Sequence, residues 1–431
     1  MRSSRLARLT GSNGWLWAVF VLAIVARVTY AAVIYTPDFS AFETGDYALY
    51  RIGADHIMTN GDFSNSLFLV RPPLFPVWIA VLGNNPALVV IGNILFGALT
   101  ASLGMVFAWS LGLSRRAGQF VGVFLAIEPT TVIYSAFLGP EPLANLFLLA
   151  ALIALVKAVR AEYGIGWSVG AGLALVASMY VRPASYLFWI PVAIGWLIYD
   201  RRWRQTWQRV AGFVVVSAVG VGAWTAHNAI VFATPSFSSI GPYTMVYYRA
   251  ASVERIATGQ PIDAVYVSIN ERVAEYAGLQ LDHIDEGTRH GFLAAPPNVQ
   301  AALNRVAGEI FRANPLITLA TFPIGFARMY GLFPDEWMVF TVGLVIFNGV
   351  FTLGAVIGVV MAVKEKRWFL LGMTLLPVLY YTAGTLIVKS AGMDTRERSM
   401  LEPMLAILFT LTVTAVWKRV KGRGDKRVDA G

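Results

Sequence analysis

The chain has no cysteine and few charged residues. The absence of cysteine among its 431 residues excludes disulfides, thiolate metal sites and a cysteine nucleophile. Only 14% of the residues are charged, against roughly 25% in a soluble domain. Hydrophobic residues make up 57% of the chain. They fall in blocks of about 20 residues, the length at which a helix crosses a bilayer core. The composition therefore excludes a soluble protein and predicts an all-α, multi-pass membrane protein.

About ten apolar blocks are predicted to span the membrane. They are Trp15–Ile34, Ala87–Leu111, Phe120–Ile133, Leu143–Val159, Gly166–Val181, Tyr186–Tyr199, Val210–Phe232, Val339–Val363, Phe369–Ile387 and Met400–Trp417. The third and sixth blocks are short, as tilted or broken helices would be. The basic residues form separate clusters at the ends of the spans, which argues against a nucleic-acid partner. These clusters fall on one side of the predicted layout and most carboxylates on the other. The positive-inside rule then places both termini in the cytoplasm of a bacterial inner membrane.

Two long segments are predicted to face the outside. In the first, residues 35–85, an amphipathic helix opens at Asp46 and runs to Met58, suited to lie in the membrane interface. Arg71-Pro72-Pro73 then begins a surface-lying or re-entrant piece. The second segment, 233–336, is more polar and reads as a small, mostly helical insertion. The predicted divisions are a transmembrane module at 1–232 that carries the catalytic loop, the insertion at 233–336, and helices with a basic cytoplasmic tail at 337–431.

Charged side chains at membrane depth cost about 2.5–3.5 kcal/mol each and mark functional sites. Cations at headgroup depth suit a phosphate or pyrophosphate group, and a neighbouring carboxylate suits a general base. The layout brings eight such residues to the outer interface: Asp46, Arg71, Glu128, Glu141, Arg182, Lys389, Arg396 and Arg398.

Structural explanations compete with this interpretation. A single interfacial arginine is explained equally well by snorkelling toward headgroups. Glu141 begins a helix, where a carboxylate complements the helix dipole. His283 and His290 flank two carboxylates, but their spacing matches no strong metal pattern, and a solvated loop explains them better. The residues themselves therefore identify no metal-ligand set.

Taken in order, the motifs resemble those of the multi-spanning GT-C glycosyltransferases, the group that contains the protein O-mannosyltransferases and the lipid A aminoarabinose transferases (glycosyltransferase 39 and 83 types). The order and sidedness of the motifs carry the resemblance more than any one of them. The matching elements are Gly45-Asp46-Tyr47-Ala48-Leu49-Tyr50, Arg71-Pro72-Pro73-Leu74-Phe75-Pro76, Glu128-Pro129, Gly139-Pro140-Glu141-Pro142-Leu143, Val181-Arg182-Pro183, Trp224-Thr225-Ala226-His227-Asn228 and Arg396-Glu397-Arg398. The chain departs from the family at His227, where arginine is common, and at Tyr47, where many members have a second acid.

The resemblance implies a GT-C bundle and an inverting transfer of a sugar from a polyprenyl-phosphate carrier at the external face. The acceptor would be a glycan, a lipid or a protein, and the lipid tail would lie between spans. Asp46 would act as the base. The resemblance leaves open whether Glu43 assists it as a second carboxylate. Some relatives use a divalent metal, for which this sequence shows no clear ligands. The phosphate would be held by Arg71, Arg182, Arg396, Arg398 and Lys389, with Tyr50, Glu128, Glu141 and Asn228 in support.

Two other functions are alternatives to transfer. A transporter or flippase of a lipid-linked sugar would be expected to show repeated halves with discontinuous helices at mid-membrane. The sequence shows no such repeat, and the candidate charges share one face. A non-catalytic scaffold would present a large apolar surface on the insertion. The sequence leaves the sugar and the acceptor open.

Overall fold

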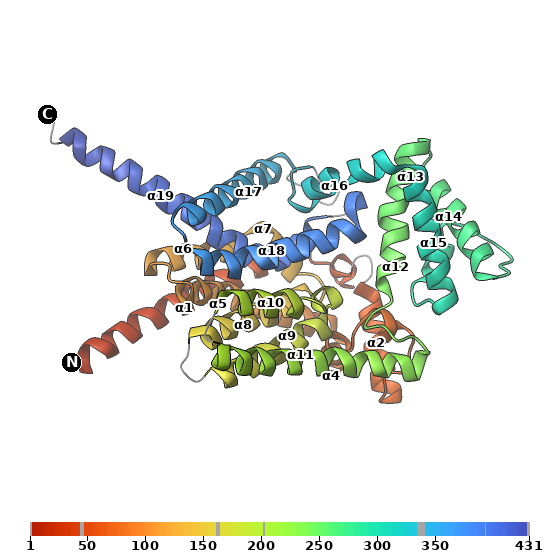
Figure 1. The fold of residues 1–431 in the computed structure, drawn as a ribbon, viewed down its shortest axis with the longest axis horizontal. Coiled ribbons are helices and arrows are strands. Elements are labelled where there is room, and N and C mark those ends of the chain that lie inside the picture. The colour runs from red at the N-terminus through yellow and green to blue at the C-terminus, as the bar shows by residue number, and fades with distance from the viewer. Residues whose placement is uncertain are drawn as a thin grey trace.

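The computed structural model describes residues 2–43, 47–160, 164–200, 203–333, 341–392 and 394–428. Over these ranges the chain forms helices joined by turns, with no β-strand. Figure 1 shows an elongated helical bundle with both chain ends on one side and helices α13 to α15 on the opposite side. The predicted all-α membrane fold is confirmed.

Each predicted span corresponds to helical structure. Within the described ranges, seven helices are long and apolar enough to cross a membrane. They are α1 (Arg2–Ile34), α5 (Pro86–Ser110), α8 (Glu141–Arg160), α11 (Trp203–Phe232), α17 (Thr341–Lys364), α18 (Trp368–Val388) and α19 (Glu402–Val428). The third predicted span is a bent pair, α6 (Arg115–Ile127) and α7 (Pro129–Ser135). The two remaining spans are the shorter apolar helices α9 (Ile165–Val181) and α10 (Trp189–Tyr199), with the 3-10 turn η2 (Pro183–Ser185) between them.

The third span breaks at Glu128-Pro129 for a local reason. Pro129 has no backbone N–H, so it suits the first position of a helix but cannot continue one. The Glu128 carboxylate accepts hydrogen bonds from the backbone N–H groups of Thr130 at 2.9 Å and Thr131 at 2.7 Å. It therefore caps α7 as a new helix, which lies at 49° to α6. The break that the sequence led us to expect is present at this position.

The first long segment folds back onto the bundle. It contains η1 (Ser40–Phe42), α2 (Tyr47–Asn60), α3 (Leu67–Val70) and α4 (Leu74–Val81). The apolar side of α2, expected to face the membrane interface, packs partly on protein: Tyr47, Tyr50 and Ala54 are buried, whereas Met58 is 50% exposed. Tyr50 is buried, and its ring meets Phe75 of α4 edge-on at 5.2 Å. Helix α4 supplies an apolar partner that the periodicity of α2 alone could not reveal.

The segment after α11 is helical and has its own hydrophobic core, which includes Val253, Ile269 and Leu303. Its elements are α12 (Ile240–Thr244), the π-helical turn η3 (Met245–Ala250), α13 (Ala251–Thr258), α14 (Ile262–Ala277), the 3-10 turn η4 (Glu286–Phe292), α15 (Pro297–Ala313) and α16 (Pro315–Met329). Helices α15 and α16 meet at 103°. The 3-10 turns η5 (Ser390–Gly392) and η6 (Thr395–Met400) join α18 to α19.

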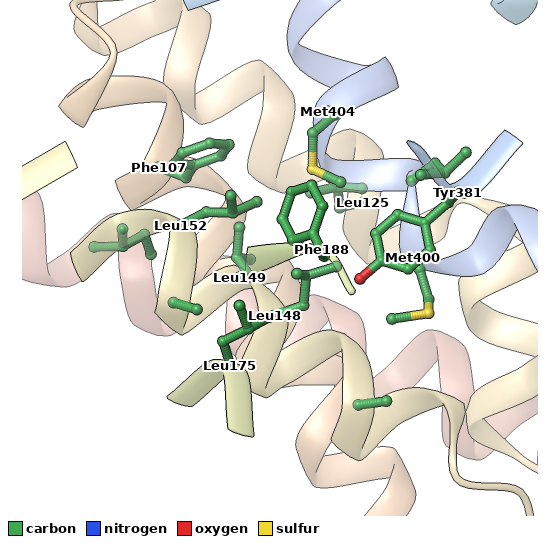
Figure 2. Close-up of a cluster of buried hydrophobic side chains, with 14 of the residues drawn as sticks. Phe107, Leu125, Leu148, Leu149, Leu152, Leu175, Phe188, Tyr381, Met400 and Met404 are labelled. Atoms are coloured by element: carbon green, nitrogen blue, oxygen red, sulfur yellow. The ribbon is translucent and has the colours of Figure 1, made fainter. Parts of the chain in front are cut away.

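The main core lies where α5, α6, α8, α9, α18 and α19 converge. Figure 2 shows Leu148, Leu149 and Leu152 of α8 packed beside Phe188 and Met404. Phe188 also lies against Tyr381 of α18, with 5.6 Å between ring centroids. Tyr381 is the polar edge of this core. Its hydroxyl is hydrogen-bonded to Ser185 Oγ at 2.7 Å. The core thus fixes the chain around η2, where the candidate site begins.

Candidate active site

Glu141 is the centre of a buried ionic cluster at the start of α8. Its Oε1 atom accepts a 2.6 Å hydrogen bond from Arg396 Nε and lies 3.4 Å from Arg182 Nη1. Its Oε2 atom accepts a hydrogen bond from the Tyr47 hydroxyl at 3.2 Å. Residues from η6, from the end of α9 and from α2 therefore converge on one carboxylate.

The loop before α8 is built to admit this carboxylate. A Cβ atom on Gly139 would lie 2.2 Å from Glu141 Oε2 and 2.7 Å from the Tyr47 ring, so only glycine fits. Asn93 Nδ2 donates to the carbonyls of Phe137 at 2.8 Å and Gly139 at 2.9 Å. In the Gly139-Pro140-Glu141-Pro142 motif, the backbone at Gly139 thus passes close to the Glu141 and Tyr47 side chains. The same motif begins α8.

Glu397 is the second carboxylate of the cluster. Its Oε2 atom accepts a hydrogen bond from Arg182 Nη2 at 2.6 Å, and its Oε1 atom accepts one from Lys389 Nζ. Burial raises the pKa of Glu397, but Lys389 and Arg182 hold it well below its ordinary value. Arg182 therefore bridges Glu141 and Glu397, which suits its planar fork of donors.

Arg71 adds a fourth cation. Its Cζ atom lies 5.3 Å from the centre of the Tyr50 ring, and the Cζ atom of Arg396 lies 4.6 Å from the Tyr47 ring. Burial and the neighbouring charge of Arg396 lower the pKa of Arg71 to about 10, so it stays protonated at neutral pH. We refer to Arg71, Arg182, Lys389 and Arg396, with Glu141 and Glu397, as the cation cluster.

Arg398 lies apart from the cation cluster, although it is only two residues from Arg396. Its guanidinium is fully buried and donates to Glu402 Oε1 at 2.5 Å, to Thr130 Oγ1 at 2.7 Å and to the Tyr330 carbonyl at 2.8 Å. It also reaches Asn348 Oδ1 at 2.9 Å and Glu128 Oε1 at 3.5 Å. Arg398 thus joins the broken span to α16, α17 and α19. Its predicted contact with a donor phosphate has no support from this position.

The remaining predicted residues are distributed as follows. Asp46, the predicted base, lies outside the described residues, directly before Tyr47 in the chain. Glu43 is half-buried and pairs with Arg51 at 2.9 Å. Asn228 donates to the carbonyl of Ser236 at 2.8 Å and closes the turn after α11. Sequence reasoning did not select Glu397 or Tyr47 as site residues. The sequence feature that could have identified Glu397 is its position between Arg396 and Arg398, at the predicted membrane interface.

Metal ligands do not gather in the described part of the chain. No group of three or more His, Asp or Glu side chains is placed there to hold a metal ion. The chemistry that these residues offer is anion binding by the cation cluster.

An apolar groove lies between α8, α10 and α18. Its lining includes Leu152, Leu155, Phe188, Trp196, Trp368, Phe369, Gly372 and Leu376. Phe188 connects this groove to the cation cluster, because it packs on Tyr381, which is hydrogen-bonded to Ser185. Ser185 lies three residues after Arg182. The groove therefore reaches from Phe188, near the charged site, toward Trp368 and Phe369 at the start of α18.

Known proteins resemble the chain in structure and not in sequence. No protein-family profile matches it, and no curated protein matches it significantly by sequence. The oligosaccharyltransferase of Archaeoglobus fulgidus in its apo form aligns over 97% of this chain and 52% of its own, with TM-score 0.55 and 13% identity. The same organism's oligosaccharyltransferase AglB, in complex with an inhibitory peptide and a dolichol-phosphate, aligns over 96% and 52%, with TM-score 0.51 and 12% identity.

ArnT from Cupriavidus metallidurans bound to undecaprenyl phosphate aligns over 93% of this chain and 78% of its own, with TM-score 0.43 and 15% identity. The chain spans about half the length of the oligosaccharyltransferase structures that it matches. At these identities the likeness establishes the fold alone: the described part of the chain shares the helical fold of the oligosaccharyltransferase structures over about half of their length.

Proposed function

We propose that the chain is a membrane glycosyltransferase that moves a sugar from a polyprenyl-phosphate carrier to a glycan, lipid or protein acceptor. The observation that carries this proposal is the cation cluster. Three cationic side chains, Arg182, Lys389 and Arg396, are held together by two buried carboxylates, and the charge of Arg71 lies near enough to Arg396 to lower its own pKa. One solved structure with this fold is a complex with a dolichol-phosphate, an anion of the class that such a cluster would bind.

In the proposed donor complex, the phosphate displaces or joins the carboxylates on Arg182, Lys389 and Arg396. The guanidinium forks bind phosphate oxygens in pairs, and lysine supplies a point charge. Glu141 and Glu397 do not bind an anion themselves. They hold the cations in place before the donor arrives, so that little side-chain entropy is lost on binding. Arg71 completes the cluster from the side of α4.

The transfer breaks the bond between the anomeric carbon and the phosphate oxygen and forms a bond from that carbon to the acceptor oxygen. The leaving polyprenyl phosphate gains negative charge, which the cation cluster stabilises. The acceptor hydroxyl loses its proton to Asp46, the proposed base, and attack opposite the leaving group inverts the anomeric centre. Asp46 precedes Tyr47, whose hydroxyl donates to Glu141.

The apolar groove between α8, α10 and α18 is the proposed site of the polyprenyl tail. Each buried CH₂ group of a lipid adds about 0.8 kcal/mol of binding free energy. The tail would therefore supply affinity, and the cation cluster would fix the position of the phosphate. Arg182 follows α9, Lys389 follows α18 and Glu141 begins α8, and these are the helix ends that the charge pattern predicts to be external. With the termini cytoplasmic, as the basic clusters predict, transfer occurs on the external face. Charges gathered at one end favour transfer at a surface over alternating access by a transporter or flippase.

The test is mass spectrometry of lipid-linked sugars and envelope glycans in a strain that lacks the gene. We expect a polyprenyl-phosphate sugar to accumulate and one sugar to disappear from an acceptor, which identifies both substrates. Complementation with the wild-type gene restores the acceptor, and Asp46→Asn does not, although the variant protein inserts normally. Unchanged lipid-linked sugars and unchanged glycans in the deletion strain would refute the proposal.

A further inference from the structure

Tyr248 lies beside the cation cluster, in the π-helical turn η3 of the segment that follows α11. The Lys389 Nζ atom lies 4.9 Å from the centre of the Tyr248 ring. Tyr248 also raises the pKa of Arg71, opposing the larger effect of burial and the effect of Arg396. The side chain is therefore close to two cations that come from different parts of the chain.

The backbone of Tyr248 is held in place from two sides. A Cβ atom on Gly392 would lie 2.9 Å from Tyr248 Cβ and 3.0 Å from its carbonyl oxygen, so η5 packs directly against the turn. The adjacent Arg249 donates to the Ile387 carbonyl at 2.7 Å, and its Cζ atom lies 4.4 Å from the centre of the Phe322 ring. Single π-helical turns are rare and occur often at functional sites.

Lys389 Nζ lies over one face of the Tyr248 ring, and the residue remains partly exposed. Tyr248 is 39% exposed, whereas Tyr243 and Tyr247 of the same segment are buried. An aromatic ring on a fixed backbone loses little entropy when it binds a ligand. Its face offers a flat apolar surface with a partial negative charge. A sugar ring is complementary to that surface, because one of its faces consists of weakly positive C–H groups while its edges carry hydroxyls.

We propose that Tyr248 is the platform on which the sugar of the lipid-linked donor stacks. The inference rests on the proposed function, because it assumes that a phosphate binds at Lys389 and Arg182. That phosphate fixes the anomeric oxygen, and the sugar then lies within one ring length of the cations, where Tyr248 is. The platform lets the protein distinguish a sugar-bearing carrier from the bare polyprenyl phosphate that the transfer releases. The competing explanation is that Tyr248 only positions Lys389.

The test compares two ligands on the full-length protein in nanodiscs. Binding is measured for undecaprenyl phosphate and for undecaprenyl phosphate that carries mannose or glucose. Tyr248→Ala is expected to weaken binding of the better sugar-bearing lipid about five- to tenfold, the worth of one aromatic contact. Binding of bare undecaprenyl phosphate should stay within about twofold of wild type. Tyr248→Phe keeps the ring and should match wild type for both ligands.

Tyr35→Ala is the control, since Tyr35 is also an exposed tyrosine and directly follows α1. Equal losses for both lipids in Tyr248→Ala would show that the residue only positions Lys389, and no loss for either would remove it from the site. Both results overturn this inference and leave the proposed function standing. Failure of the wild-type protein to bind either lipid would count against the proposed function itself.

Discussion

Arg182 Nη2 lies 2.6 Å from Glu397 Oε2, although 215 residues separate the two in the chain. The other terminal nitrogen of the same guanidinium lies 3.4 Å from Glu141. One arginine at the end of α9 therefore links the start of α8 to the turn before α19. Arg182 precedes a proline and Glu141 follows Gly139-Pro140, whereas Glu397 is placed by the 3-10 turn η6.

Because Arg182 contacts both carboxylates, a positive charge at position 182 is predicted to be insufficient for donor binding without the guanidinium group. Arg182→Lys keeps one positive charge but cannot reach Glu141 and Glu397 together. A charge-assisted hydrogen bond contributes about 1.5–3 kcal/mol, so we expect the KM for the lipid donor to rise about tenfold or more. Steady-state transfer at varied donor concentration measures it. Arg305→Lys is the control, because Arg305 is exposed and its contacts, with Glu309 and the Tyr276 ring, lie outside the cation cluster. A KM equal to wild type would contradict the bridge.

Arg398 is predicted to matter for stability. Arg398→Met leaves Glu402 and Glu128 buried without their cation, which costs about 3–5 kcal/mol in comparable buried pairs. The expected result is a clearly lower melting temperature in detergent. Adding Glu402→Gln to that variant should recover part of the loss, because it removes one uncompensated carboxylate. If Arg398→Met kept the wild-type melting temperature but lost donor binding, the result would contradict a structural role and indicate that Arg398 binds the donor phosphate.

The apolar groove can be blocked without a clash. Gly372 lines the groove on α18, and a Cβ added there meets no atom within 4 Å. Gly372→Phe should fill the groove and weaken binding of a long-chain polyprenyl phosphate about tenfold, while a short-chain analogue binds as before. Gly384→Phe is the matched control, since Gly384 lies on the same helix, has the same open surroundings and is outside the groove lining. Equal effects of the two variants would exclude the groove as the tail site.

The depressed pKa of Glu397 sets a direction for pH dependence. A carboxyl with a lowered folded-state pKa stabilises the protein above its unfolded pKa of about 4.3, and the contribution is lost as pH falls through the folded value. The difference in melting temperature between wild type and Glu397→Gln should therefore be constant from about pH 8 to 5 and shrink below about pH 4. A change in that difference between about pH 5 and 7 would show that Glu397 is not held ionised.

The sequence predicted the bundle well because the length of an apolar span is a local property. Each predicted span has its helix, and the break at Glu128-Pro129 follows from the missing N–H of proline. The site was predicted in part. Sequence reasoning selected Glu141, Arg71, Arg182, Lys389 and Arg396, which the fold brings together. It could not separate Arg396 from Arg398, because the turn of η6 decides which guanidinium enters the core. Nor could it foresee that α4 would cover the apolar side of α2.

The central claim is that the cation cluster binds a lipid phosphate. The most direct measurement is native mass spectrometry of the purified protein with undecaprenyl phosphate, for wild type, Arg182→Gln and the control Arg305→Gln. The account predicts a bound lipid on wild type and on Arg305→Gln, and little or none on Arg182→Gln at the same lipid concentration. Equal occupancy of all three proteins would contradict it.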